Sequence, residues 1–413
     1  MLLFYIMMPF IGLSAQDTAK TTTTAVLATA IEDSNYNYHA DQIDYIDENT
    51  YSLSYIDHLE LRTRTRNFDL NEQSYRLRAY TNFPKERKLN NKYKARSLDE
   101  GRLQGREKLN NALEYRYELI ISMIKNEEVL QGKLKLKELL EDRITILKKM
   151  ANNLDFDYQD LLVAENDYHK LQIDLVDLEN NMKQSSREVS ALLGVKEKVQ
   201  LDREDIISVE GIALFVNSFE EEISEDNLYY AQQTLDVELA ELEYEQKKAS
   251  AKTPLKFLEA SYRDDFNEGF RKDFSLGVGL KIPIGSAVKG SLNERVIKIA
   301  KEKNNLDDIK YELEEDISET LTVLEVLFAK HRLLSAILEE SNEEESLKKY
   351  QSIEGISPLV LLKVKENMIK KRQILLDMEK QIFSSYLEFL DLNGLLVRSP
   401  VVNYLSSKND LVF

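Results

Sequence analysis

The chain of 413 residues contains no cysteine and has few glycines and prolines. The lack of cysteine excludes disulfides, thiol catalysis, thiolate zinc sites and lipidation of an N-terminal cysteine. Thirteen glycines and six prolines are about half and a third of average usage, so turn-forming residues are scarce. No apolar run reaches 18 residues, so no membrane-spanning helix is predicted. A content of 31% charged and 43% hydrophobic residues instead suits long amphipathic helices.

Charge and motif content argue against nucleic-acid binding and against catalysis. With 55 basic and 73 acidic residues the net charge is −18, and a negative surface repels phosphate. The four histidines have no metal-ligand spacing, and the sequence contains no phosphate loop and no nucleophile motif. We therefore expect a protein that is not an enzyme, with no catalytic residues, no metal site and no cofactor.

The N-terminal residues 1–15, MLLFYIMMPFIGLSA, are apolar and end in small residues. This pattern predicts a secretory signal peptide, although no Lys or Arg precedes Lys20. A buried strand or a misassigned start codon are the alternatives. Residues 16–51 are rich in Thr, Asp, Asn and Tyr, which predicts a flexible segment.

An internal repeat organises the remainder of the chain. Residues 161–194 and 361–394 align without a gap at an offset of 200, and ten of the 34 positions are identical. Each segment ends in a glycine, and the two glycines are in register. Residues 75–84 and 274–283 match at an offset of 199. We interpret the chain as a tandem duplication with a period near 200 residues.

Each repeat is predicted to contain a β-hairpin, a long helix and a returning helix. In the first repeat, 52–195, we predict strands over 57–68 and 73–83 with a turn at 69–72, a helix over 86–150 and a return from 161. In the second, 256–396, we predict strands over 256–265 and 272–282 with a turn at 267–269, a helix over 287–352 and a return from 361. An acidic linker with a connecting helix over 227–251 fills 196–255, and 397–413 form a tail.

The predicted fold class is therefore mainly α with a small β part, built on tandem-duplicated long antiparallel helical hairpins. Asp157 and Ser357 are predicted to cap the returning helices, with Pro358 at the first helical position of the second.

The strand near 274–282 alternates between apolar and small or polar residues. Its apolar positions are Phe274, Leu276, Val278, Leu280 and Ile282. Such alternation suits a half-buried strand of a soluble sheet, or a transmembrane β-strand. We favour lipid contact, because nothing else in the sequence is available to cover this face. Four strands cannot close a barrel, whereas three chains would supply twelve.

The first hairpin carries arginines at alternating positions. Arg62, Arg64 and Arg66 lie on one strand and Arg76 and Arg78 on its partner, and Lys281 follows in the second hairpin. An arginine facing lipid at mid-depth costs about 2–4 kcal/mol, so we expect these charges at the lumen or the rim. They could attract anionic cargo or lipid phosphate. Pairing with acids of the second hairpin, such as Asp264 and Asp265, is the simpler interpretation and the one we favour.

These segments resemble the TolC-type outer-membrane efflux proteins. The Pro-ending strand at 274–284, Gly290 and the helix start SLNERVIKIAKEK resemble that family's second strand-to-helix entry. The break EGISPLVLL at 354–362, before a helix that ends at Gly394, resembles its tip loop and returning helix. The resemblance implies a homotrimer with a shared twelve-stranded β-barrel in outer-membrane lipid and a coiled-coil tunnel in the periplasm. It also implies passive export, with a periplasmic adaptor and an inner-membrane transporter as partners.

The resemblance places the adaptor contact at the periplasmic tips of the helices. The candidate residues are Asn152, Asn153, Asp157, Asp160, Gly355, Ser357 and Pro358. One departure is that no helix is predicted before the first hairpin. This departure leaves open that the protein is a relative of the family that no longer transports. A coiled-coil scaffold or periplasmic adaptor is a further alternative.

Overall fold

The computed structural model describes residues 18–49, 54–66, 69–151, 156, 158–203, 205–219, 223–263, 274–280, 287–340, 348, 352, 357–408 and 410–413. The chain divides into two compact units. The first comprises Met1–Asp33, Leu109–Glu222 and Asp316–Phe413, and the second Ser34–Lys108 and Ile223–Glu315. The long helices α3 (Pro84–Met150) and α7 (Ala287–Glu340) contribute to both units.

The second unit contains a four-stranded antiparallel sheet. Its strands, in spatial order, are β2 (Ile56–Arg66), β3 (Asp69–Thr81), β5 (Leu255–Arg263) and β6 (Phe274–Leu280). The two predicted hairpins are therefore present, and β3 and β5 join them edge to edge. Regular pairing of Ser74–Tyr80 with Phe257–Arg263 fixes which side chains share each face of the sheet.

The first hairpin differs from the prediction at residues 69–72. Residues 69–72, DLNE, belong to strand β3, so the turn predicted there is wrong. Arg66 pairs with Asp69, whereas Thr65 pairs with Gln73, and the extra residues on β3 form an irregularity in the ladder. The turn predicted at 267–269 lies outside the described residues.

A helix precedes the first hairpin, contrary to the prediction of a flexible segment over 16–51. Helix α2 (Ser34–Glu48) lies in the second unit. Its Ile43 side chain lies 3.5 Å from the points that a Cβ atom would occupy on Gly101 and Gly105 of α3. Ile43 thus lies over both glycines on the surface of α3. The helix whose apparent absence suggested a relative without transport is therefore present. The connecting helix is present as α6 (Leu228–Lys252).

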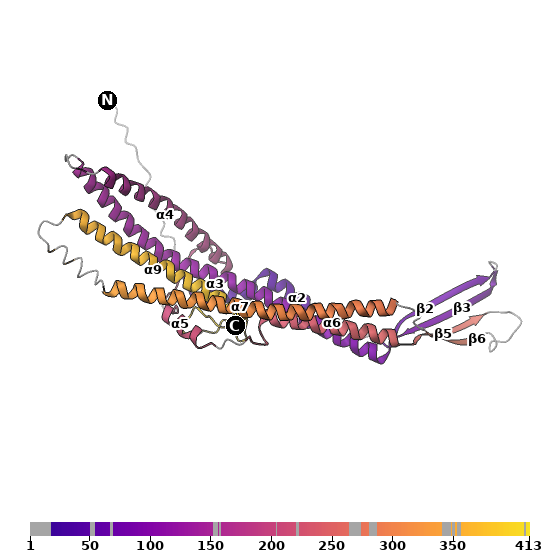
Figure 1. The fold of residues 1–413 in the computed structure, drawn as a ribbon. Coiled ribbons are helices and arrows are strands. Elements are labelled where there is room, and N and C mark those ends of the chain that lie inside the picture. Colours follow the sequence, from indigo (N-terminus) through magenta and orange to yellow (C-terminus); the bar gives the residue numbers. More distant parts are fainter. Residues whose placement is uncertain are drawn as a thin grey trace, which may run out of the picture. The chain divides into compact units, whose positions relative to one another are not determined.

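The first unit contains four long helical segments that lie in the order α4, α3, α9 and α7 (Figure 1). Helix α4 spans Tyr158–Leu192 and α9 spans Pro358–Leu392. Leu136 and Leu140 of α3 pack against Leu171 and Leu175 of α4, at the spacing of one face of each helix. Across α3, α9 and α7 the buried residues follow the same periodicity, so a single layer of antiparallel helices buries its apolar stripes.

The returning helices confirm the duplication. Helices α4 and α9 each have 35 residues and begin and end 200 positions apart. Gly194 and Gly394 follow them with φ values of 67° and 65°, a conformation that glycine adopts without steric cost. The Ser357 hydroxyl accepts a hydrogen bond from the Leu359 N–H at 3.3 Å, and Pro358 begins the helix, as predicted. Helix α7 is described over Ala287–Glu340, and residues 341–347 beyond it lie outside the described residues, so the predicted end at 352 stays a prediction.

The linker and tail add a compact part to the first unit. Strands β1 (Thr18–Thr21) and β4 (Lys198–Leu201) pair in parallel. The same part contains α1 (Thr23–Ala28), a 3₁₀ helix (Thr29–Glu32) and α5 (Val209–Asn217). The buried Tyr117 hydroxyl donates to Val402 O and accepts from Tyr404 N, both at 3.1 Å. The tail is thus held by buried hydrogen bonds of α3.

Candidate functional site

One face of the four-stranded sheet is apolar and exposed in the single chain. On β6, Phe274, Leu276, Val278 and Leu280 have exposed fractions of 47%, 79%, 63% and 63%. The strand register places further exposed apolar side chains on the same face: Leu59, Leu61, Leu77, Tyr75 and Leu258. Ile282, predicted to belong to it, lies outside the described residues. An apolar face that continues across four strands and has no cover is typical of a surface that meets lipid or protein.

The opposite face of the sheet is polar and can be followed in rows across the strands. The first row contains Glu60, Arg78, Glu259 and Gly277, and the second contains Arg62, Arg76, Ser261 and Ser275. The third contains Arg64, Ser74 and Arg263. The predicted Lys281 lies outside the described residues, and so does the side chain of Arg66.

Acids of both hairpins pair with these arginines. The Glu259 carboxylate lies 2.6 Å from Arg78 Nε and 3.2 Å from Arg76 Nε. Glu60 lies 2.6 Å from Arg62 Nε and 3.6 Å from Arg78 Nη1. Cross-strand pairing with the second hairpin, which the sequence favoured, is therefore present, and among the described residues its acid is Glu259. Asp264 and Asp265 lie outside the described residues.

Aromatic rings adjoin the first row on the polar face. The Arg78 guanidinium lies 4.5 Å from the centroid of the Phe257 ring, Tyr80 is tilted against Phe257 at 5.5 Å, and His58 stacks on Tyr80 at 4.2 Å. A Cβ on Gly279 would lie only 2.4 Å from the Phe257 ring, so the absence of a side chain there makes room for the ring. These contacts fix the direction of Arg78.

The helix tips are described in part. Asp160 at the start of α4 lies 3.5 Å from Lys363 at the start of α9, so this predicted tip charge is paired. Ser357 and Pro358 form the start of α9 as stated above. Asn152, Asn153, Asp157 and Gly355 lie outside the described residues, and the structure does not test their predicted role or the predicted cap at Asp157.

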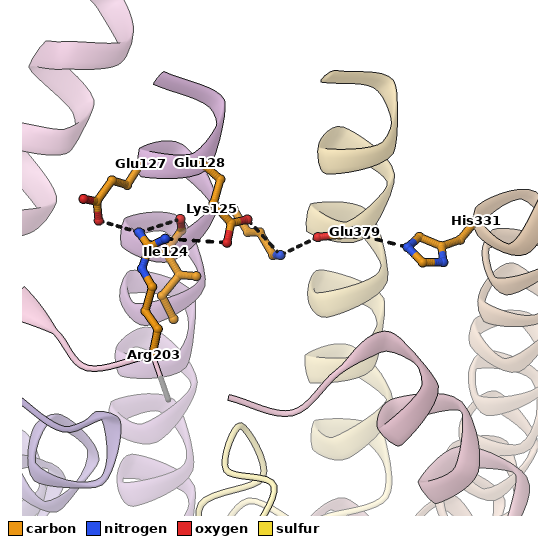
Figure 2. A network of polar contacts seen from close by, with 7 residues as sticks. All are labelled: Ile124, Lys125, Glu127, Glu128, Arg203, His331 and Glu379. Atoms are coloured by element: carbon orange, nitrogen blue, oxygen red, sulfur yellow. Dashed lines mark hydrogen bonds and ion pairs between the residues drawn. The ribbon is translucent and has the colours of Figure 1, made fainter. Parts of the chain in front are cut away.

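A polar network that the sequence did not reveal joins three helices of the first unit (Figure 2). Lys125 Nζ of α3 lies 2.6 Å from Glu379 Oε2 of α9, and Glu379 Oε1 lies 3.5 Å from His331 Nε2 of α7. Lys125 also contacts Glu128 at 3.1 Å, and Arg203 from the linker contacts Glu127 and Glu128. Lys125 and His331 are buried, so this network of polar contacts fixes the lateral order of the helices.

An acidic groove of about 540 Å³ lies between α3 and α9. Its charged lining residues are Glu114, Glu118, Lys380, Glu388 and Asp391. Burial raises the pKa of the Glu114 carboxyl, and the nearby Asp391 and Glu118 raise it further. Ionised Glu114 is therefore less favourable in the folded chain than in the unfolded chain.

Replacing Glu114 with glutamine should stabilise the protein at neutral pH. Because the folded-state pKa is raised, stability linked to this group is present at acid pH and is lost as pH rises through that pKa. We expect Glu114→Gln to raise the thermal midpoint at pH 7 by about 1–3 °C, since solvent screens a half-buried group, with the gain shrinking toward acid pH. Glu138→Gln, which removes the same charge from an exposed position of α3, is the control. A gain in the thermal midpoint that is equal at pH 7 and at acid pH would contradict an origin in the raised pKa of Glu114.

None of the described helices carries an apolar stretch long enough to cross a membrane.

Solved structures of outer-membrane proteins share this fold. The outer membrane protein VceC of Vibrio cholerae aligns with a TM-score of 0.65 at 10% identity, over 90% of this chain and 96% of VceC. The open-state MtrE outer membrane channel of Neisseria gonorrhoeae gives 0.64 at 12% identity, over 90% and 89%. The CmeC outer membrane channel of Campylobacter jejuni gives 0.62 at 10% identity, over 94% and 87%. No protein-family model and no curated protein sequence matches the chain.

The chain therefore has the fold of the TolC-type outer-membrane channels. The likeness extends over nearly the whole of each chain, so it includes the duplicated helices as well as the sheet. The fold predicted from the resemblance is confirmed: long duplicated helical hairpins with four strands.

Proposed function

We propose that the protein is one protomer of a trimeric outer-membrane channel that passively conducts small molecules or secreted substrates out of the cell. The apolar face of the sheet carries this proposal. Burying it in lipid, with the polar face turned to water, satisfies both faces of a transmembrane β-strand. Phe274, Leu276, Val278 and Leu280, and by extension Ile282, are the proposed lipid-facing residues.

The edges of the sheet support an assembly of several chains. A bilayer does not tolerate open strand edges, and the sheet of one chain has two of them, at β2 and β6. Pairing β6 of one copy with β2 of the next would remove every edge. Three copies of a four-stranded sheet give twelve strands, an even number within the range of known outer-membrane barrels.

Exposed apolar positions on the outer helices of the first unit support the same ring. Helix α7 exposes Val323, Val326, Leu333 and Ile337 on one side, and α4 exposes Leu162, Ile173 and Val176. These two helices lie at opposite ends of the helical layer (Figure 1). Two different surfaces that pack against each other form a head-to-tail interface, and such an interface closes into a ring when the rotation permits.

The proposed location and partners follow from the resemblance. We propose that residues 1–15 direct export, that the strands lie in the outer membrane and that the helical part lies in the periplasm. The helix tips, with Asn152, Asn153, Asp157, Asp160, Gly355, Ser357 and Pro358, would meet a periplasmic adaptor coupled to an inner-membrane transporter. The paired charges of Asp160 and Lys363 and the Ser357 cap support a defined tip surface.

The detergent-corrected mass of protein extracted from the outer-membrane fraction tests the proposal. We expect a species near three times the mass of the mature chain. A monomer or dimer in the soluble fraction would contradict the channel and favour a coiled-coil scaffold or periplasmic adaptor, in which another protein would have to cover the apolar face.

A further inference from the structure

The polar face of the sheet carries a charge opposite in sign to that of the whole protein. Among its described side chains are five arginines, at positions 62, 64, 76, 78 and 263, and two glutamates, Glu60 and Glu259. Their sum is +3, whereas the chain as a whole carries −18. The chain has more acidic than basic residues, so its overall composition does not account for a positive surface of this kind.

The charges are also sorted along the strands. Both glutamates lie in the first row, with Arg78 between them. The second row places Arg62 directly opposite Arg76, and the third places Arg64 and Arg263 on either side of Ser74. Like charges directly opposite one another destabilise a sheet. The second row is therefore not arranged for the stability of the sheet alone.

The two glutamates already contact three of the arginines. Glu259 contacts Arg76 and Arg78, and Glu60 contacts Arg62 and Arg78. Neither Arg64 nor Arg263 has a described acidic residue opposite it in the strand register, and both are exposed. The excess positive charge is thus concentrated in the third row, the one farthest from the helix-bearing ends of β3 and β5.

We propose, on the basis of the proposed channel, that this face forms a positive ring in the lumen that favours anionic solutes bearing carboxylate or phosphate groups. The arginines point away from the apolar face, so in the channel they face water and not lipid. Rings of Arg or Lys select anions in pores, and guanidinium groups match carboxylate and phosphate geometry. Three copies would triple the charge of the ring.

Charge inversion at the third row provides the test. Arg64→Glu with Arg263→Glu changes the charge of the described face from +3 to −1 without touching the paired arginines. Purified trimers are placed in planar bilayers, and the chloride-to-potassium permeability ratio is taken from the reversal potential in a salt gradient. We expect the ratio to fall about threefold or more, with a smaller change at high salt because the Debye length is about 10 Å at 0.1 M.

The control variant, Arg187→Glu with Arg398→Glu, makes the same charge change at exposed positions of α4 and the tail. An unchanged ratio in the sheet variant, or an equal fall in the control, would overturn the anion-selective ring while leaving the channel intact. Arg64→Gln with Arg263→Gln gives a milder change that should lower the ratio by an intermediate amount. Wild-type protein that yields no trimer and no conductance would overturn the proposed channel, and the selective ring with it.

Discussion

Replacing Val278 with arginine is expected to abolish assembly of the protein in the outer membrane. Val278 lies in the middle of β6 with 63% of its surface exposed, on the face proposed to meet lipid. An arginine at mid-depth on such a face costs about 2–4 kcal/mol, and a trimer would carry three of them. The measurement is the amount of trimer in the outer-membrane fraction, and Leu276→Asp should behave in the same way.

Ser275→Arg is the matched control, because it adds the same side chain to the same strand on the polar face. Ser275 loses one hydrogen bond of 2.7 Å between its hydroxyl and that of Ser261, and its new charge faces water. We expect trimer at close to the wild-type level. If Val278→Arg instead assembled normally, or formed a soluble trimer, contact between this face and lipid would be refuted.

Much of the fold could be predicted from the sequence because the decisive signals are local. Ser357 and Pro358 specify the start of α9 through a cap and a fixed φ, and Gly394 specifies its end through a left-handed conformation. The same end signal, Gly194, recurs 200 residues earlier, so one half of the chain predicts the other. The apolar face of β6 follows from the alternation of side chains along a strand.

Features that depend on contacts distant in sequence could not be predicted. Helix α2 has no buried residue, and its contact with α3 is made by Ile43 on two glycines about sixty positions away. Its polar composition therefore suggested a flexible segment. Arg78 and Glu259 are 181 positions apart, and their pairing depends on the register of β3 against β5. The sequence indicated an acid in the second hairpin but not which one.

Removing the carboxylate of Glu366 is expected to destabilise the helical layer more than any exposed charge change. Glu366 Oε2 of α9 lies 3.1 Å from Arg143 Nη1 of α3, and only 8% of each side chain is exposed. In Glu366→Leu the Arg143 guanidinium would stay buried without its partner, at a cost of about 3–5 kcal/mol in the free energy of unfolding. The measurement is chemical denaturation of the detergent-purified protein followed by circular dichroism.

Asp174→Asn serves as the comparison, since Asp174 forms a 2.9 Å pair with Lys133 in which the two side chains are 43% and 22% exposed. Loss of that pair should cost about 1 kcal/mol or less, because water solvates both charges once they separate. The double variant Arg143→Met with Glu366→Leu should recover most of the lost stability, since it leaves no buried charge uncompensated. A double variant as unstable as Glu366→Leu would mean that the packing around α9, and not the unpaired guanidinium, accounts for the loss.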